Sequence, residues 1–315
     1  MQGQARLADP GQGRALTGML LPLMLIFLQD PLTLKDWARL RPDLAKAPEH
    51  VLRQWLVACN QAGEDPQERL AALEIYAQLG GANQLTAVLE LLANDPHPQG
   101  LATLRAICQR DPRAFESLLA IAENSKDWRA LACAYAGQLA PAVRPDPSMC
   151  EPLLLRMLGE PLESLHGEVV LLAGRLGSEK AVPRLVELMA SGDEALRRDA
   201  HWSLLRITGL KLLPRGEDWE QWLGRERRWW DERAEQAVAD LWSEQPAVQQ
   251  RALEEIGERI WRRSELIPEL ERYLEGAGTG LSGQAQAILS RWQHSGAKEV
   301  RAPDKQRILR PSRKP

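Results

Sequence analysis

From Thr33 onward, the chain repeats a helical pattern of apolar and polar positions. Apolar residues recur at i, i+3, i+4 and i+7, and no stretch alternates as a strand would. Helix starts are predicted at Asp127, Asp193 and Asp218, because a carboxylate there can accept hydrogen bonds from the first free backbone N–H groups. The pattern therefore predicts an all-α protein.

The ends of the predicted helices recur at intervals of roughly 30 residues, except for one interval of 49 residues that contains the tryptophan stretch. They fall at Leu79-Gly80, Ile107, Leu139, Leu176-Gly177, Ile207-Thr208-Gly209, Ile256-Gly257 and Ile288. Glycine suits such ends because it adopts the left-handed conformation at little cost. Since a short helical unit of this length cannot bury its apolar face alone, neighbouring units must stack. We therefore expect an α-solenoid, a superhelix of stacked antiparallel helix pairs.

One segment carries a family resemblance, LHGEVVLLAGRLGSEKAVPRLVELMASGDEALRRDAHWSLLRITG at 165–209. It resembles HEAT and HEAT-like repeats, including those of the PBS-lyase type: a helix ends in Leu-Gly, Pro183 lies early in the next helix, and an Asp-initiated helix follows. SKDWRALACAYAGQL at 125–139 matches the same second helix, and weaker copies lie at 69–95 and 251–274. The resemblance covers about residues 65 to 292 and implies a scaffold or adaptor, although a few lyases and DNA glycosylases share this superhelix.

The stretch that follows the best repeat, RITGLKLLPRGEDWEQWLGRERRWW, also resembles a tail found after HEAT units in some bacterial repeat proteins. On these grounds we divide the chain into a signal-like or hydrophobic segment at 1–34, HEAT-like repeats at 35–215, a Trp-rich helical insertion at 216–243, further HEAT-like repeats at 244–295 and a basic disordered tail at 296–315.

The N-terminal segment contains an uncharged stretch at 15–28, preceded by Arg6 and Arg14. It has the length of a signal-peptide core and is shorter than the roughly 20 residues of a membrane span. Two interpretations stay open: an export signal or short anchor, and a buried hydrophobic helix, which Pro22 and the missing cleavage site favour. Membrane contact through 15–28 is an open alternative, and we expect an exported or envelope-associated protein in preference to a cytoplasmic one.

Four tryptophans lie between Asp218 and Arg233. At 100° per residue, all four occupy one helical arc of about 100°, while acidic and basic residues share the opposite side. This distribution predicts a packing face that seals a helix inserted between two repeats, in preference to a platform for nucleic-acid bases. Glu226 falls on the aromatic arc, and Gly224 is a candidate break or bend in the helix.

A candidate binding face lies in the preceding helix, EALRRDAHWSLLRI. Trp202 sits off the apolar stripe and shares a face with Arg198 and Arg206, four residues to either side, so the guanidinium groups can stack on the indole. An exposed Arg-Trp-Arg face suits a protein or anionic ligand, because Trp and Arg are enriched among interface hot spots. The alternative is that the tryptophan helix at 219–230 covers Trp202.

The function we expect is that of a non-enzymatic scaffold that binds another protein through its concave helical surface. The predicted partner-binding residues are Arg129, Arg197, Arg198, His201, Trp202, Arg206 and Arg251. One alternative is a DNA-binding enzyme similar to the HEAT-like DNA glycosylases, which needs a carboxylate beside a tryptophan; Asp199 near Trp202 is the candidate pair. A further alternative is a structural envelope protein. The net charge of −3 and the pI near 6.1 argue against a nucleic-acid partner.

Sequence motifs point to no catalytic, cofactor-binding or metal-binding residue. The five histidines form no HExxH pair, and the four cysteines are too far apart in sequence for a zinc cluster. We expect buried free thiols, with disulfides as the alternative in an exported chain. The basic tail is expected to aid solubility, with contact to anionic lipid or nucleic acid as the alternative.

Overall fold

The structure is a computed structural model, and it describes residues 33, 34, 37, 47, 49–62, 65–94, 97–276 and 280–294. Within these ranges every regular element is a helix, so the all-α prediction is confirmed. The chain forms two compact units, Met1–Arg110 and Asp111–Pro315. Their boundary lies inside the block predicted as HEAT-like repeats at 35–215. The predictions for the apolar stretch at 15–28 and the tail at 296–315 lie outside the described residues.

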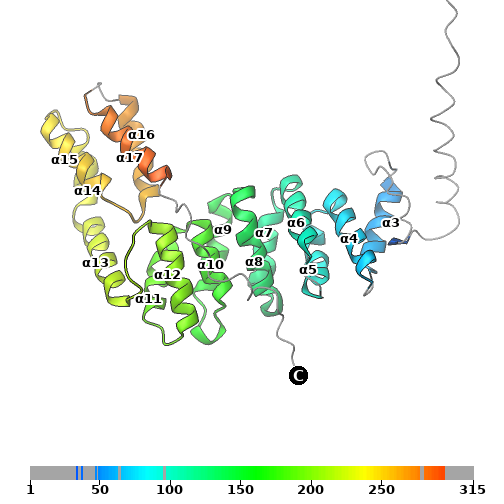
Figure 1. The fold of residues 1–315 in the computed structure, drawn as a ribbon. Helices are drawn as coiled ribbons and strands as arrows, with labels where there is room; N and C mark the ends of the chain where they lie inside the picture. The colour runs from blue at the N-terminus through cyan, green and yellow to red at the C-terminus, as the bar shows by residue number, and fades with distance from the viewer. Residues whose placement is uncertain are drawn as a thin grey trace, which may run out of the picture. The chain divides into compact units, whose positions relative to one another are not determined.

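The N-terminal unit contains short helices that pack on one another. They are α3 (Glu49–Cys59), α4 (Pro66–Leu79), η2 (Ala82–Gln84), α5 (Leu85–Asn94) and α6 (Pro98–Arg110). Helix α4 lies against α3, α5 and α6 (Figure 1). Trp37 closes the outer end, where its ring meets the Trp55 ring edge-on at 5.4 Å and its indole N–H donates to Glu74 at 3.2 Å.

The C-terminal unit holds the remaining helices. They are α7 (Ala114–Asn124), α8 (Lys126–Val143), α9 (Pro147–Leu158), η3 (Leu162–Ser164), α10 (Gly167–Leu176), η4 (Glu179–Ala181), α11 (Val182–Met189), α12 (Glu194–Thr208), α13 (Gly216–Glu232), α14 (Ala234–Asp240), α15 (Pro246–Gly257), α16 (Arg263–Gly276) and α17 (Ser282–His294). Many of these helices contact both the helix that follows them in the chain and the one after that. Helices α8, α10 and α12 pack in succession, as do α7 with α9 and α11 with α13 (Figure 1).

The predicted helix boundaries are only partly right. Asp193 caps α12 by accepting hydrogen bonds from the backbone N–H groups of Ala195 and Leu196, and Gly177 and Gly209 end α10 and α12 with φ of 69° and 72°. The predicted starts at Asp127 and Asp218 are wrong, since both residues lie within the first turn of α8 and α13. Likewise, α6, α8 and α17 continue beyond the predicted ends at Ile107, Leu139 and Ile288.

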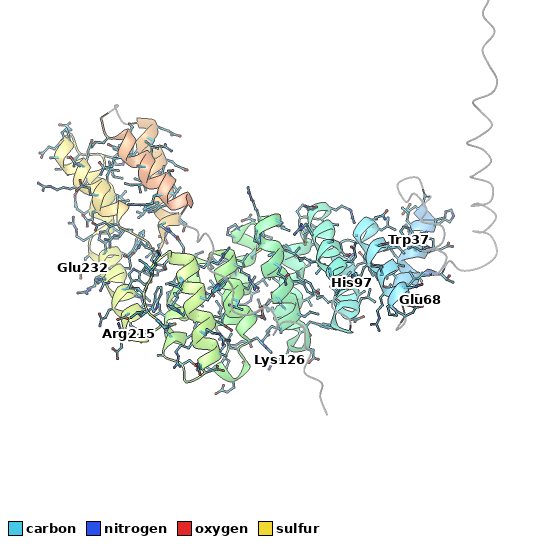
Figure 2. All side chains as sticks on the ribbon, in the orientation of Figure 1. Trp37, Glu68, His97, Lys126, Arg215 and Glu232 are labelled. Atoms are coloured by element: carbon cyan, nitrogen blue, oxygen red, sulfur yellow. The ribbon has the colours of Figure 1, made fainter. Side chains whose placement is uncertain are left out.

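Helix α13 confirms the packing face of the tryptophan stretch. Trp219, Trp222 and Trp229 are buried, and Trp230 is half-buried. Glu226 lies on the same arc and is also buried. Its carboxylate accepts hydrogen bonds there from the Arg259 guanidinium and from two backbone N–H groups that precede α16. The helix continues through Gly224 from Arg215 at its N-cap to Glu232 at its end (Figure 2), so the predicted break is absent.

Hydroxyl groups join helices that are one helix apart in the chain. Thr103 on α6 donates to the carbonyl of Leu73 on α4 at 2.9 Å, and Ser203 on α12 donates to the carbonyl of Val170 on α10 at 2.8 Å. Gly174 permits the second contact, because a Cβ at that position would lie 2.7 Å from Ser203 Cα. Helices α10 and α12 are therefore in close backbone contact.

Arginines cap the C-terminal ends of several helices from positions further along the chain. Arg110 donates to the Gly80 carbonyl after α4, Arg184 donates to the Leu158 carbonyl at the end of α9 at 3.0 Å, and Arg291 donates to the Gly257 carbonyl at the end of α15. Terminal carbonyls lack partners within their own helix, so these guanidinium groups satisfy acceptors that the helix leaves free.

All four cysteines are free and buried, which confirms the prediction of buried thiols. Burial raises the pKa of Cys59 and Cys133 to about 12 and that of Cys150 to about 11. Among the described helices, none is both long and apolar enough to cross a membrane.

Candidate functional site

Arg129, the first of the predicted partner-binding residues, is a buried structural residue. Its side chain is 3% exposed, and its guanidinium donates to the carbonyls of Ala122 and Glu123 at the end of α7, both at 2.9 Å. A third contact joins it to the carboxylate of Glu160 at 2.5 Å. Every nitrogen of the guanidinium is thereby engaged within the fold, and none is presented to a partner.

His201 is also engaged within the fold. One of its ring nitrogens lies 2.9 Å from the carbonyl oxygen of Leu212, and its ring meets the Trp219 ring edge-on at 6.0 Å. The side chain thus holds the loop after α12 against α13. Arg251 on α15, by contrast, is exposed, and it lies on a different part of the unit from α12.

Trp202 lies between two arginines as predicted, but one of the two differs from the prediction. Trp202 is 6% exposed, so of the two interpretations left open by the sequence the indole is buried and not part of an exposed face. Its flanking cations are Arg206, with the guanidinium carbon 5.6 Å from the ring centroid, and Arg175 on α10, at 6.0 Å. Arg175 takes the place that Arg198 was predicted to fill. Trp202 is therefore a platform between two arginines from adjacent helices.

The arginines around Trp202 differ in their freedom to bind. Arg206 is half-buried, and within the described chain its guanidinium has no hydrogen bond or ion pair. The Arg198 side chain is 53% exposed and lies 3.6 Å from Asp199. Arg197 is half-buried and donates a long hydrogen bond of 3.4 Å to the Ser191 carbonyl. Arg206 and Arg198 are thus the α12 cations best placed to meet an external group.

Two carboxylates lie near these arginines, the half-buried Glu168 and the buried Asp199. Glu168 on α10 faces Arg175 at 3.7 Å, and Asp199 is 8% exposed. Burial raises the pKa of Glu168, and the neighbouring Asp199 raises it further, while the positive charge of Arg175 opposes both effects. Burial likewise lowers the pKa of Arg175. The pair is poorly matched, since neither Arg175 Nη1 nor Glu168 Oε2 has a hydrogen-bond partner.

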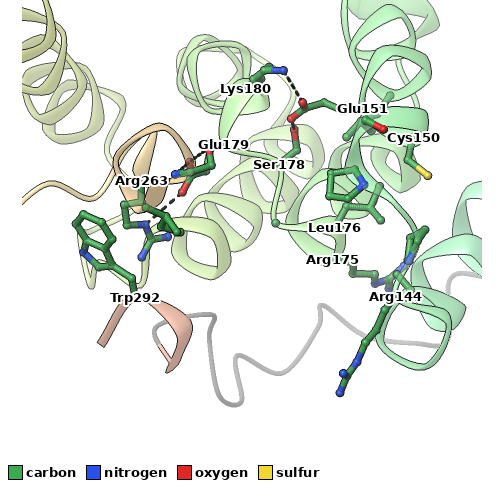
Figure 3. A pocket seen from close by; sticks show the side chains of 18 residues that line it. Arg144, Cys150, Glu151, Arg175, Leu176, Ser178, Glu179, Lys180, Arg263 and Trp292 are labelled. Carbon is green, nitrogen blue, oxygen red and sulfur yellow. Dashed lines mark hydrogen bonds and ion pairs between the residues drawn. The ribbon is translucent and has the colours of Figure 1, made fainter. Parts of the chain in front are cut away.

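Arg175 also lines a cavity of about 580 Å³ in the C-terminal unit (Figure 3). Its walls come from the ends of α8, α9 and α10, from η4 and from α16 and α17. Lys180 contacts Glu151 at 2.8 Å, and Arg263 contacts Glu179 at 3.2 Å beside Trp292. Because each of these carboxylates has its own cation, the remaining positive charge of the wall belongs to Arg144 and Arg175.

Glu179 holds this side of the cavity together. It accepts from the Arg263 guanidinium and from the backbone N–H and hydroxyl of Ser264, while its carbonyl accepts from the Trp261 indole at 3.0 Å. Arg263 donates in addition to the Ile207 carbonyl at the end of α12 at 2.9 Å. The start of α16 is thus joined to η4 and α12, and polar contacts connect this part of the cavity wall.

Sequence reasoning missed Arg144, Arg175 and Glu168 as site residues. Arg175 occupies an ordinary position in the predicted helix, and only its neighbours across the helix interface distinguish it. The one available signal is small: Gly137 on α8 has no side chain where a Cβ would lie 2.5 Å from Arg175 Nη1.

Comparison with known proteins gives a negative finding. No family model matches the chain, and no curated protein does either. The HEAT-like resemblance therefore stays a prediction. In the part of the chain that the structure describes, no group of three or more His, Cys, Asp or Glu residues could hold a metal ion.

Proposed function

We propose that the chain is a non-enzymatic helical-repeat scaffold that binds another protein, and that its helices form an α-solenoid of HEAT-like type. The solenoid is supported by contacts that recur at a regular sequence separation. The hydroxyl-to-carbonyl bonds of Thr103 and Ser203 span 30 and 33 residues. The contacts of the Arg110, Arg156 and Arg291 guanidinium groups, with the Gly80 carbonyl, the Glu123 carboxylate and the Gly257 carbonyl, span 30, 33 and 34. Such a spacing is expected when each unit packs on the next.

The observation that carries the binding proposal is the arginine pair on α12. Arg206 stacks on buried Trp202 and has no acidic partner within the described chain, so its guanidinium is held in place before a ligand arrives. Little side-chain entropy is then lost on binding, and a preorganised arginine can pair with a carboxylate through two hydrogen bonds. Arg198 lies about two helical turns before Arg206 on the same helix. Together they form a surface that suits an acidic patch on a protein partner.

The glycosylase-like alternative has weaker support. Asp199 is 8% exposed and Trp202 is 6% exposed. Neither side chain can contact a nucleic-acid base unless α10 and α12 separate. The arginines alone would favour phosphate, so nucleic acid is kept as an outcome of the test.

The experiment is affinity capture from cells with the tagged full-length chain and an Arg198→Ala, Arg206→Ala double variant. The matched control is an Arg215→Ala, Arg272→Ala double variant, because these side chains are 66% and 63% exposed and neither residue belongs to α12. All three proteins are compared at equal helicity, with and without nuclease treatment. A protein captured by the original and the control but lost with the α12 variant supports the proposal.

Other outcomes overturn the proposal in distinct ways. Equal capture by all three proteins overturns the α12 site. Loss of every captured protein on nuclease treatment replaces the protein partner with nucleic acid. Capture of no protein above an untagged background overturns the scaffold function.

A further inference from the structure

The cavity in the C-terminal unit has the dimensions of a small-molecule site. Its volume of about 580 Å³ lies within the range of roughly 300–1,000 Å³ that such pockets occupy. Neither Arg198 nor Arg206 of α12 lines it, and the scaffold proposal does not use it.

The charges of its wall favour a monoanion. Four cations and two carboxylates line the cavity, and the pairs Lys180–Glu151 and Arg263–Glu179 neutralise one another. Arg175 faces Glu168 at 3.7 Å without a hydrogen bond through Nη1. Arg144 has no ion pair or side-chain hydrogen bond within the described chain, and Figure 3 shows it apart from both neutralised pairs. One full positive charge is therefore left without a counter-charge.

The position of Arg144 is unusual for an arginine. It is the C-cap of α8 and has φ of 50° and ψ of 62°, a left-handed conformation that glycine or asparagine adopts more readily. A bulky side chain there costs stability that glycine would not. Glycine would therefore serve the helix end better, but it would remove the side chain that carries the guanidinium.

The opposite wall is apolar. Leu154, Ile267 and Trp292 face the space between α9, α16 and α17, and Trp292 is 8% exposed. An apolar body placed there would be removed from water while a charged end remained beside the arginines. From the uncompensated charge, the apolar wall and the volume, we infer that the cavity binds a small amphipathic monocarboxylate, with its carboxylate at Arg144 and Arg175 and its apolar body against Ile267 and Trp292.

The test is a fluorine NMR titration of the full-length chain with para-trifluoromethyl phenylacetate. The corresponding phenylacetamide has the same shape without the charge, and inorganic phosphate is the competing oxyanion. We expect the carboxylate to bind at least about tenfold more tightly than the amide, because a charge-assisted hydrogen bond contributes that much. Phosphate should displace it only weakly.

Two variants separate binding from folding. Arg144→Gly should weaken carboxylate binding at least about fivefold while the melting temperature stays equal or rises, since glycine is favoured at a left-handed position. Arg215→Ala, far from the cavity, should bind as the original chain does. Any of four results would overturn the inference. They are equal binding of the acid and the amide, tighter binding of phosphate than of the carboxylate, unchanged carboxylate binding by Arg144→Gly, and no saturable binding at millimolar probe.

Discussion

Two glycines in helix interiors provide a sharp test of the packing between α10 and α12. Gly174 and Gly224 both lie inside helices, where alanine is normally favoured over glycine by about 1 kcal/mol. A Cβ at Gly224 would meet nothing within 4 Å. At Gly174 it would lie 2.7 Å from both Cα and Oγ of Ser203, closer than carbon atoms approach.

The two alanine substitutions should therefore have opposite signs. Gly224→Ala should raise the free energy of unfolding by up to about 1 kcal/mol. Gly174→Ala gains the same intrinsic term, but overpacking costs about 1–3 kcal/mol, and displacement of Ser203 from the Val170 carbonyl costs about 1 kcal/mol more. The net loss is about 1–3 kcal/mol, so the two variants should differ by about 2–4 kcal/mol.

The assay is urea unfolding followed by far-ultraviolet circular dichroism, with both variants compared with the original chain. A third and a fourth protein, Ser203→Gly alone and combined with Gly174→Ala, form a double-mutant cycle. Since Ser203→Gly removes two of the three nearest atoms, it should reduce the cost of Gly174→Ala. Stabilisation by Gly174→Ala, or strict additivity in the cycle, would refute the close contact between the helices.

Three further predictions concern buried polar groups. Arg129→Met should lower the free energy of unfolding by about 2–3 kcal/mol, because the substitution leaves two helix-end carbonyls and Glu160 without their donor. The control is Arg53→Met, at a side chain that is 76% exposed. In the same urea assay it should change the free energy of unfolding by less than about 1 kcal/mol. Burial raises the pKa of Glu168 in the folded chain, so the folded state holds its proton more tightly than the unfolded state. Its contribution to stability should be greatest below the unfolded pKa and should fall as pH rises through the folded pKa. Between these two pKa values, the melting temperature of Glu168→Gln should therefore rise relative to that of the original chain. A difference in melting temperature that stays constant with pH would contradict the raised pKa. The four buried thiols, with pKa raised to about 11 for Cys150, should react with an aromatic disulfide reagent at pH 8 only after denaturation, and rapid reaction of the folded chain would show that a thiol is accessible.

The sequence predicts helices well where a local stop or cap determines them. Asp193, Gly177 and Gly209 act within their own turns, so their roles can be recognised from neighbouring residues. Ile107 and Leu139 carry no stop signal of their own, and the helices continue past them. In α8 even Pro141 lies inside the helix, which then ends at Arg144 in a left-handed conformation that the sequence does not suggest.

The candidate sites are less predictable, because they depend on contacts between helices. The apolar stripe of α12 predicts one buried face, yet α12 packs against α10 as well as α11, and Trp202 is buried on the second side. Arg206 was found because its partner lies four residues away on the same helix. Arg175 was missed because its partner lies on another helix, and the cavity beside it unites residues from Ala140 to Trp292.

The arginine caps imply an order in which parts of the chain reach their final state. Arg110, Arg184 and Arg291 each follow the carbonyls that they cap, at sequence separations of 30, 26 and 34 residues. During synthesis from the N-terminus, each of these helix ends must wait for its arginine to leave the ribosome. A nascent chain that ends before the arginine would hold a complete helix whose terminal carbonyls have only water as a donor. Each newly made segment therefore completes the one made before it.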